Sequence, residues 1–373
     1  MASEDLDRVF GQTAPMRTAI WIGLCVVVAC GDDDETADAA VDAPGRDAPG
    51  VDAPGVDAPG VDAPGVDAPG SDAGGGDGMF FPAGAWMYQN IEAASVRPDS
   101  DATTQWLVDN GGWGVGRLQI DFSIVVLDAD AEPRRTFTPT DDFFRPDCDE
   151  VPVPVPLGGM LEGEDGYECT TGGDCHLIVV DWGSRELFEM WRADIGDTFN
   201  GGCLAVWDMS RVYPPEGRGE QCTSADAAGF PIAPLLFYPE EIEAGEINHA
   251  IRFILPNDRM RADLYTRPAS HAGGPRGPAP APVYGSRWRL KPDVDISPYS
   301  AGAQVVLRAL QRYGMALADG GNIALTAASD RNRSVGWDGL LEPRDLEGIE
   351  PTDFEVLDTG PDIDLTFDCV RTP

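Results

Sequence analysis

Two aspartates and two histidines of this chain have the side-chain types that acid–base chemistry requires. Asp208 ends an apolar stretch, and Asp226 lies in a short polar segment after Cys222. A pair of carboxyl groups is what glycoside cleavage uses, one as the acid and the other as base or nucleophile. His249 and His271 could contact the substrate or move a proton. We therefore predict Asp226, Asp208, His249 and His271 as candidate catalytic residues.

Aromatic and cationic side chains near these residues would hold a substrate. An aromatic face beside carboxylates suits sugar binding, so Trp207 and Arg252 are the candidate substrate contacts. Asp226, Asp319 and Trp207 can each also be interpreted as residues with a purely structural role. Asp226 could place a negative charge at a helix N-terminus, Asp319 could be a turn residue before two glycines, and Trp207 could pack in a core.

The common catalytic motifs do not occur in this sequence. It contains no G-x-S-x-G elbow, no P-loop, no H-E-x-x-H and no G-x-G-x-x-G that opens a helix. The tightest group of metal-binding residue types is Cys169, Cys175 and His176, which lacks the C-x₂-C spacing of a structural zinc site. We therefore expect no metal and no cofactor, although three histidines leave a metal site as an alternative.

The sequence around Cys30 indicates the cellular location of the protein. It follows the apolar run 19–29, which is shorter than the roughly 20 residues of a membrane-spanning helix. Val27-Val28-Ala29-Cys30 resembles a bacterial lipobox, which implies cleavage before Cys30 and lipidation of that cysteine. We therefore expect residues 1–29 to be a lipoprotein signal peptide, with Met16 as the alternative start. An uncleaved anchor is the competing interpretation.

A low-complexity linker follows. Residues 41–70 are six copies of Val-Asp-Ala-Pro-Gly, with Arg46 replacing valine once. This repeat offers too little apolar surface to offset chain entropy, so residues 30–78 should form a disordered linker that holds the folded part away from the lipid. Calcium binding by the repeated aspartates is the alternative. The expected location is the cell envelope, lipid-anchored at the outer membrane or cell surface and extracytoplasmic.

Six further cysteines remain after Cys25 and Cys30. An even number in an exported chain predicts up to three disulfides, and six cysteines allow 15 pairings. The disulfide candidates are Cys148, Cys169, Cys175, Cys203, Cys222 and Cys369.

The chain is strongly acidic. Its net charge is −38: residues 1–29 carry −1, residues 30–78 carry −12, and residues 79–373 carry the remaining −25. Nucleic acid and anionic lipid both require a positive surface, so neither is an expected partner. The expected partners are membrane lipid, through Cys30, and a polysaccharide or other glycan.

Residues 79–373 should form one β-rich α+β domain with a few helices. Turn residues separate short segments with strand patterns, without the strand–helix alternation of a doubly wound sheet. The predicted strands are 119–127, 176–181, 187–191, 203–209, 250–255, 287–290, 322–326 and 353–357. The predicted helices are 303–313, 239–244 and 223–228, and the Pro/Gly-rich stretch 268–285 should be a long surface loop.

Several segments resemble a family of secreted bacterial and fungal hypothetical proteins. They are Gly173-Asp174-Cys175-His176-Leu-Ile-Val-Val-Asp181, Thr223-Ser-Ala-Asp-Ala-Ala-Gly229-Phe-Pro-Ile232, Gly245-Glu-Ile-Asn-His249-Ala-Ile-Arg252-Phe253, Arg289-Leu290 and Ala309-Leu-Gln-Arg-Tyr-Gly314-Met-Ala-Leu-Ala-Asp319-Gly320. The similarity runs from about residue 81 to residue 357. It implies export and a single domain but supplies no mechanism, although many members occur in carbohydrate-degrading settings.

The sequence is therefore compatible with three functions. The first expectation is a membrane-anchored lipoprotein that acts on or binds extracellular carbohydrate, and an enzyme of this kind would be a glycoside hydrolase or polysaccharide lyase. It could instead be a non-catalytic surface binding protein, or a structural envelope lipoprotein. The enzyme requires two carboxyl groups about 5–10 Å apart in one cleft. The binding protein requires an aromatic patch without convergent titratable groups, and the structural protein would have its histidines and Asp226 far apart.

Overall fold

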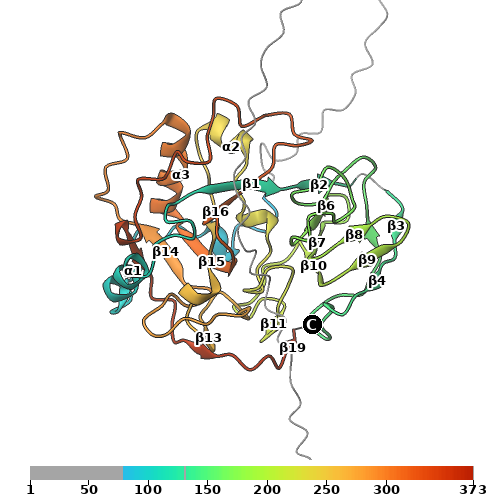
Figure 1. Ribbon diagram of the computed structural model, residues 1–373, viewed down its shortest axis with the longest axis horizontal. Helices are drawn as coiled ribbons and strands as arrows, with labels where there is room; N and C mark the ends of the chain where they lie inside the picture. The colour runs from blue at the N-terminus through green and yellow to red at the C-terminus, as the bar shows by residue number, and fades with distance from the viewer. Residues whose placement is uncertain (1–78, 130–131, 373) are drawn as a thin grey trace, which may run out of the picture. The chain divides into compact units, whose positions relative to one another are not determined.

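Two β-sheets contribute to one hydrophobic core in the computed structural model, which describes residues 79–129 and 132–372 (Figure 1). The predicted signal peptide, the lipidated Cys30 and the repeat linker lie outside the described residues. Strands outnumber helices and are spread over several sheets, which confirms the prediction of a β-rich α+β fold. In the described part of the chain, no helix has the length and apolar character needed to cross a membrane.

The larger sheet has six strands and mixed direction. The pairs β12–β15, at the centre, and β1–β16, at one edge, are parallel, and the remaining pairs are antiparallel. In spatial order the strands are β1 (Ile120–Ile124), β16 (Leu325–Ala328), β12 (Ile251–Leu255), β15 (Met315–Gly320), β14 (Arg287–Leu290) and β17 (Phe354–Val356). Five of the six match predicted strand segments, although β16 begins three residues later than expected, and β15 was not predicted.

The smaller sheet has four strands. In spatial order they are β10 (Leu204–Asp208), β7 (Glu186–Met190), β6 (Leu177–Asp181) and β2 (Val126–Asp128). The predicted single strand 119–127 is wrong in one respect, because it divides at Val125 into β1 and β2, which belong to different sheets. Figure 1 shows β1 running directly into β2, so this segment links the two sheets.

The two faces of the smaller sheet serve different cores. Ile178, Val180 and Leu187 point into the main core with the six-stranded sheet. Leu177 and Val179, which alternate with them, point into a second, smaller cluster. This alternation follows from the two-residue period of a strand. It explains why 176–181 reads as a continuous apolar run, because both faces of β6 are buried.

Several two- and three-stranded pairings complete the described part. They are β3 (Arg134–Arg135) with β5 (Val153–Pro154), β4 (Thr138–Pro139) with β9 (Phe199–Gly201) and β8 (Asp194–Ile195), β11 (Gly219–Glu220) with β19 (Val370–Arg371), and β13 (Leu264–Tyr265) with β18 (Ile363–Asp364). Four short 3₁₀ turns cover Trp86–Tyr88, Ala233–Leu235, Asn257–Arg259 and Pro351–Asp353.

Helices α2 (Pro239–Ala244) and α3 (Ala301–Arg312) form where the sequence predicts them. The Ser300 hydroxyl accepts the Ala303 amide at the start of α3, and Gly314 follows its end with φ of +69°. Helix α1 (Ser100–Asp109) was not predicted. Its sequence is largely polar and has only a weak apolar stripe, so periodicity gives little sign of it.

The predicted helix at 223–228 is wrong, because these residues form turns. The Ser224 hydroxyl donates to the Phe230 carbonyl over 2.6 Å and accepts the Asp226 amide over 3.0 Å. A serine side chain that bonds nearby backbone groups competes with the helical pattern. We call residues 223–230 the turn segment.

All six cysteine candidates form disulfides, which confirms that prediction. The pairs are Cys148–Cys203, Cys169–Cys175 and Cys222–Cys369. The last pair joins the residue before the turn segment to the residue before β19, beside the β11–β19 ladder.

Candidate functional site

A row of polar side chains crosses one face of the six-stranded sheet. Asp121 on β1 lies opposite Thr326 on β16, and β16 pairs with β12 in a register that brings Thr326 opposite Arg252. Arg252 Nη1 donates to Thr326 Oγ1 over 3.2 Å. Asp319, near the end of β15, contacts Arg252 Nη2 at 3.3 Å. Charged groups on a buried sheet face are costly unless they are paired, so this row is a candidate functional feature.

Asp226 meets this row from the turn segment. Its Oδ1 atom accepts Arg252 Nε over 2.9 Å and lies 2.8 Å from Arg252 Nη2. The side chain has no exposed surface, and Oδ2 has no hydrogen-bond partner in the structure. Burial raises the pKa of Asp226 to about 8, although Arg252 opposes the shift. Burial therefore favours the neutral form of this carboxyl group, whereas Arg252 favours the ionised form.

Solvent reaches Asp319, which has 17 % of its side chain exposed. Burial raises its pKa as well, again against the effect of Arg252. Since both carboxyl groups contact the same Nη2 atom, their oxygens lie within about 6 Å, close to the spacing of a retaining carboxyl pair. The enclosed position of Asp226, however, leaves no surface at which a substrate could contact it in this structure.

His176 approaches the turn segment from the other sheet. Its Nδ1 lies 2.6 Å from Glu162 Oε2, and its Nε2 lies 3.1 Å from the Ala225 carbonyl oxygen. Both neighbours are acceptors, so both ring nitrogens must carry hydrogens and the ring is an imidazolium. Burial alone would lower the pKa of His176, but Glu162 raises it to about 9.

The other predicted catalytic residues have separate settings. Asp208 is exposed, and Ser210 hydrogen bonds lower its pKa. His249 contacts Glu241 at 3.1 Å, beside α2. His271 Nδ1 donates to the Ala227 carbonyl over 2.9 Å. The structure therefore brings Asp226 together with Arg252, and His271 to the neighbouring backbone, while Asp208 and His249 have other partners.

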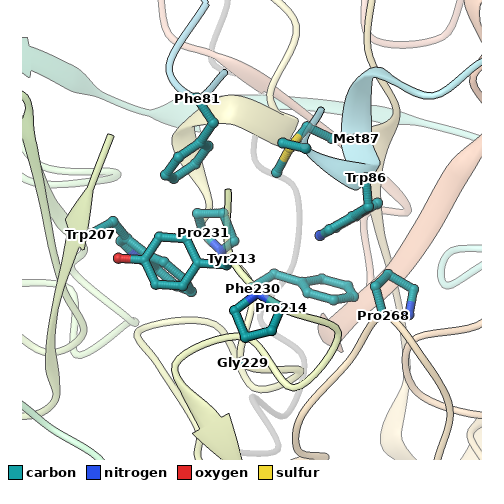
Figure 2. Close-up of a pocket in the computed structure, with 12 residues that line it drawn as sticks. Phe81, Trp86, Met87, Trp207, Tyr213, Pro214, Gly229, Phe230, Pro231 and Pro268 are labelled. Carbon is teal, nitrogen blue, oxygen red and sulfur yellow. The ribbon is translucent and has the colours of Figure 1, made fainter. Parts of the chain in front are cut away.

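Trp207, a predicted substrate contact, is buried. Its indole nitrogen donates to Glu189 Oε2 over 3.0 Å. Burial raises the pKa of Glu189 to about 7, and the other oxygen accepts the Ile232 and Ala233 amides. Trp207 also borders an aromatic crevice, shown in Figure 2 with Phe81, Trp86, Tyr213 and Phe230. The crevice has a volume of about 30 Å³, which is room for a few waters at most and too little for a sugar ring.

A larger hollow of about 250 Å³ lies where β2, the start of α2 and two loops meet. We call it the polar hollow. The residues around it are Val126, Leu127, Asp128, Pro156, Leu157, Gly158, Gly159, Glu240, Asn332, Arg333 and Ser334. Glu240 accepts Arg333 Nε over 3.0 Å, and Asp128 Oδ1 accepts the Trp182 indole nitrogen over 2.9 Å. Leu157 is 97 % exposed at its edge.

The polar hollow was not predicted from the sequence. Its polar side chains come from three segments far apart in the chain. Asp128 follows a predicted strand and Glu240 was assigned only to the first turn of a helix. Nothing in the local pattern marks Asn332, Arg333 and Ser334, because they lie in a loop. Only the folded chain shows that these residues share one hollow.

Two groups of side chains in the described residues have a spacing that could hold a metal ion. One is Asp147 with Cys222 and Cys369, and the other is Glu164 with Cys169 and Cys175. In each group the two cysteines are joined in a disulfide, so neither offers a thiolate. The residues present do not fit a metal centre of the Cys/His type.

Comparison with known proteins found no matching family model, no matching curated protein and no matching solved structure.

Proposed function

We propose that this protein is an exported, lipid-anchored binding protein that recognises an extracellular carbohydrate in the polar hollow. The observation that carries the proposal is the convergence of carboxylate, amide, hydroxyl and guanidinium groups from three separate segments on one hollow of about 250 Å³. Ligand sites combine a concave shape with a few convergent polar groups, and sugars offer many hydroxyls to such groups.

The lining also suits the apolar side of a sugar ring. Val126, Leu127, Pro156 and Leu157 supply aliphatic surface beside the polar groups. Leu157 is a large apolar side chain left almost wholly in water, and an exposed apolar group at the rim of a hollow is typical of a binding edge. A ligand with both hydroxyl groups and C–H faces would use both parts of this lining.

Charge supports a neutral rather than an anionic glycan. Two of the three charged side chains at the hollow are carboxylates, Asp128 and Glu240, and the chain as a whole carries −38. A strongly acidic protein repels polyanions at a distance. Three disulfides support the exported setting, because such bonds persist in oxidising compartments.

Binding is favoured over cleavage at Asp226 because that carboxyl group is enclosed. Cleavage remains a second candidate, on a different observation: Asp128 and Glu240 border the same hollow, and glycosidases use paired carboxyl groups. Release of new reducing ends from a bound glycan, lost in both Asp128→Asn and Glu240→Gln, would make the hollow an active site.

A glycan array with the full chain in detergent tests the proposal, followed by calorimetry with the strongest ligand. Asn332 has φ of +67°, so Asn332→Gly removes its side chain without straining the backbone. The double variant Asn332→Gly/Ser334→Ala loses this amide and the Ser334 hydroxyl. It should bind the glycan about tenfold more weakly, because two neutral hydrogen bonds to the ligand are lost. Ser297→Ala, an exposed serine outside the hollow, is the matched control. Absence of any glycan ligand, or equal affinity in all variants, would refute the proposal.

A further inference from the structure

The turn segment is held against the six-stranded sheet by contacts with titratable side chains and by a backbone hydrogen bond. Arg252 on β12 binds the Asp226 side chain. The Ala227 amide donates to Asp319 Oδ2 on β15 over 3.4 Å, and the Ala228 amide donates to the Ala318 carbonyl over 2.9 Å. His176 binds the carbonyl of Ala225, as described above. Charged and titratable side chains therefore converge on three consecutive residues, Ala225 to Ala227.

Arg252 is the cation that contacts the Asp226 side chain, and it is shared with a second carboxyl group. Arg252 approaches from β12, but Asp319 on β15 shares its Nη2 atom. Glu189 on β7 adds a second nearby carboxyl group. An ionised Asp226 would also leave the charged, enclosed Oδ2 atom without a donor. A buried charge without sufficient partners is unstable, and either a proton or water must relieve it.

We propose that the Asp226 carboxyl group is a proton-operated latch: protonated, it lets the turn segment close on the sheet, and its ionisation favours the segment's release. Release would admit water to Asp226 Oδ2 and break the hydrogen bonds that the Ala227 and Ala228 amides donate to β15. It would also move Gly229 and Phe230, which border the aromatic crevice in Figure 2. The inference concerns regulation of this segment and does not rest on the proposed glycan site.

The direction of the pH effect follows from the two states. In the closed state the pKa of Asp226 is about 8. In a released, hydrated segment it returns to an ordinary value of about 4. The released state then loses its proton first, so the opening equilibrium should rise about tenfold per pH unit between these values and level off above pH 8. Acid therefore keeps the latch closed.

Hydrogen exchange of the Ala228 amide tests this. The full chain would be measured at pH 5, 6 and 7, with exchange rates corrected for their intrinsic pH dependence. Wild type should show a rise in opening of about tenfold per unit. Asp226→Asn, which resembles the protonated side chain but cannot ionise, should lose that rise. Asp208→Asn, an exposed carboxylate elsewhere, should retain it.

A second measurement needs no variant. The carboxyl carbon of Asp226, followed by NMR in the labelled wild-type chain, should titrate near pH 8. A titration near pH 4, or an Ala228 amide whose opening has the same pH slope in wild type and Asp226→Asn, would overturn the proposal.

Discussion

Removing the Cys222–Cys369 disulfide should cost far more stability than removing Cys169–Cys175. The two pairs are matched in packing, because each joins one buried cysteine to one half-buried cysteine. They differ in the loop that they close, with sequence separations of 147 and 6 residues. Loop-closure entropy assigns about 5 kcal/mol to the longer loop and about 2 kcal/mol to the shorter.

The assay is equilibrium urea unfolding of the Cys222→Ala/Cys369→Ala and Cys169→Ala/Cys175→Ala double variants, followed by tryptophan fluorescence. The expected difference between their free energies of unfolding is about 3 kcal/mol. Each double variant loses one buried and one half-buried sulfur, so the effect of removing these atoms cancels in the comparison. Contacts beside the longer disulfide remain in the variant, including the β11–β19 ladder. Equal losses in the two variants would refute the loop-closure argument.

Two further outcomes follow from particular groups. The free energy of unfolding should fall as pH rises from 5 to 9. Folding raises the pKa values of Glu189, Asp226 and His176 to about 7, 8 and 9, so each group binds its proton more tightly in the folded chain. The stability that each group contributes is lost as pH rises from its unfolded pKa to its folded pKa. Urea midpoints that rise over this range would contradict this prediction. Gly285→Ala should lower the free energy of unfolding by an amount on the order of several kcal/mol, from backbone strain and overpacking together. At this position φ is +83°, and a Cβ atom would lie 2.0 Å from the Thr266 carbonyl oxygen. A thermal midpoint equal to that of wild type would contradict this prediction.

Local patterns predicted the elements that carry their own signals. Helix α3 has a clear apolar stripe with a serine cap and a terminal glycine, and α2 begins at Pro239 and ends at Gly245. The cysteine count predicted three disulfides, but not their pairing, because pairing depends on distances in the folded chain. Helix α1 was missed because its residues are mostly polar, and its contacts to β17 come from 250 residues away.

The site was predictable only in part. Asp226 and Arg252 were candidate site residues and Asp319 was interpreted as a possible turn residue, and the fold unites Arg252 with both aspartates. Their contact depends on strand order in the six-stranded sheet, which brings together β12, β15 and β16. The polar hollow lay beyond sequence reasoning for the same reason: Asp128 and Asn332 meet only after β2 joins the smaller sheet and the loop after β16 folds beside it.

A crystal structure of the chain with the strongest array glycan tests the central claim most directly. The account predicts the sugar in the polar hollow, with its hydroxyl groups within hydrogen-bond distance of Asn332 and Ser334 and a C–H face against Leu157. A glycan bound elsewhere on the surface, with the hollow occupied by water alone, would contradict it.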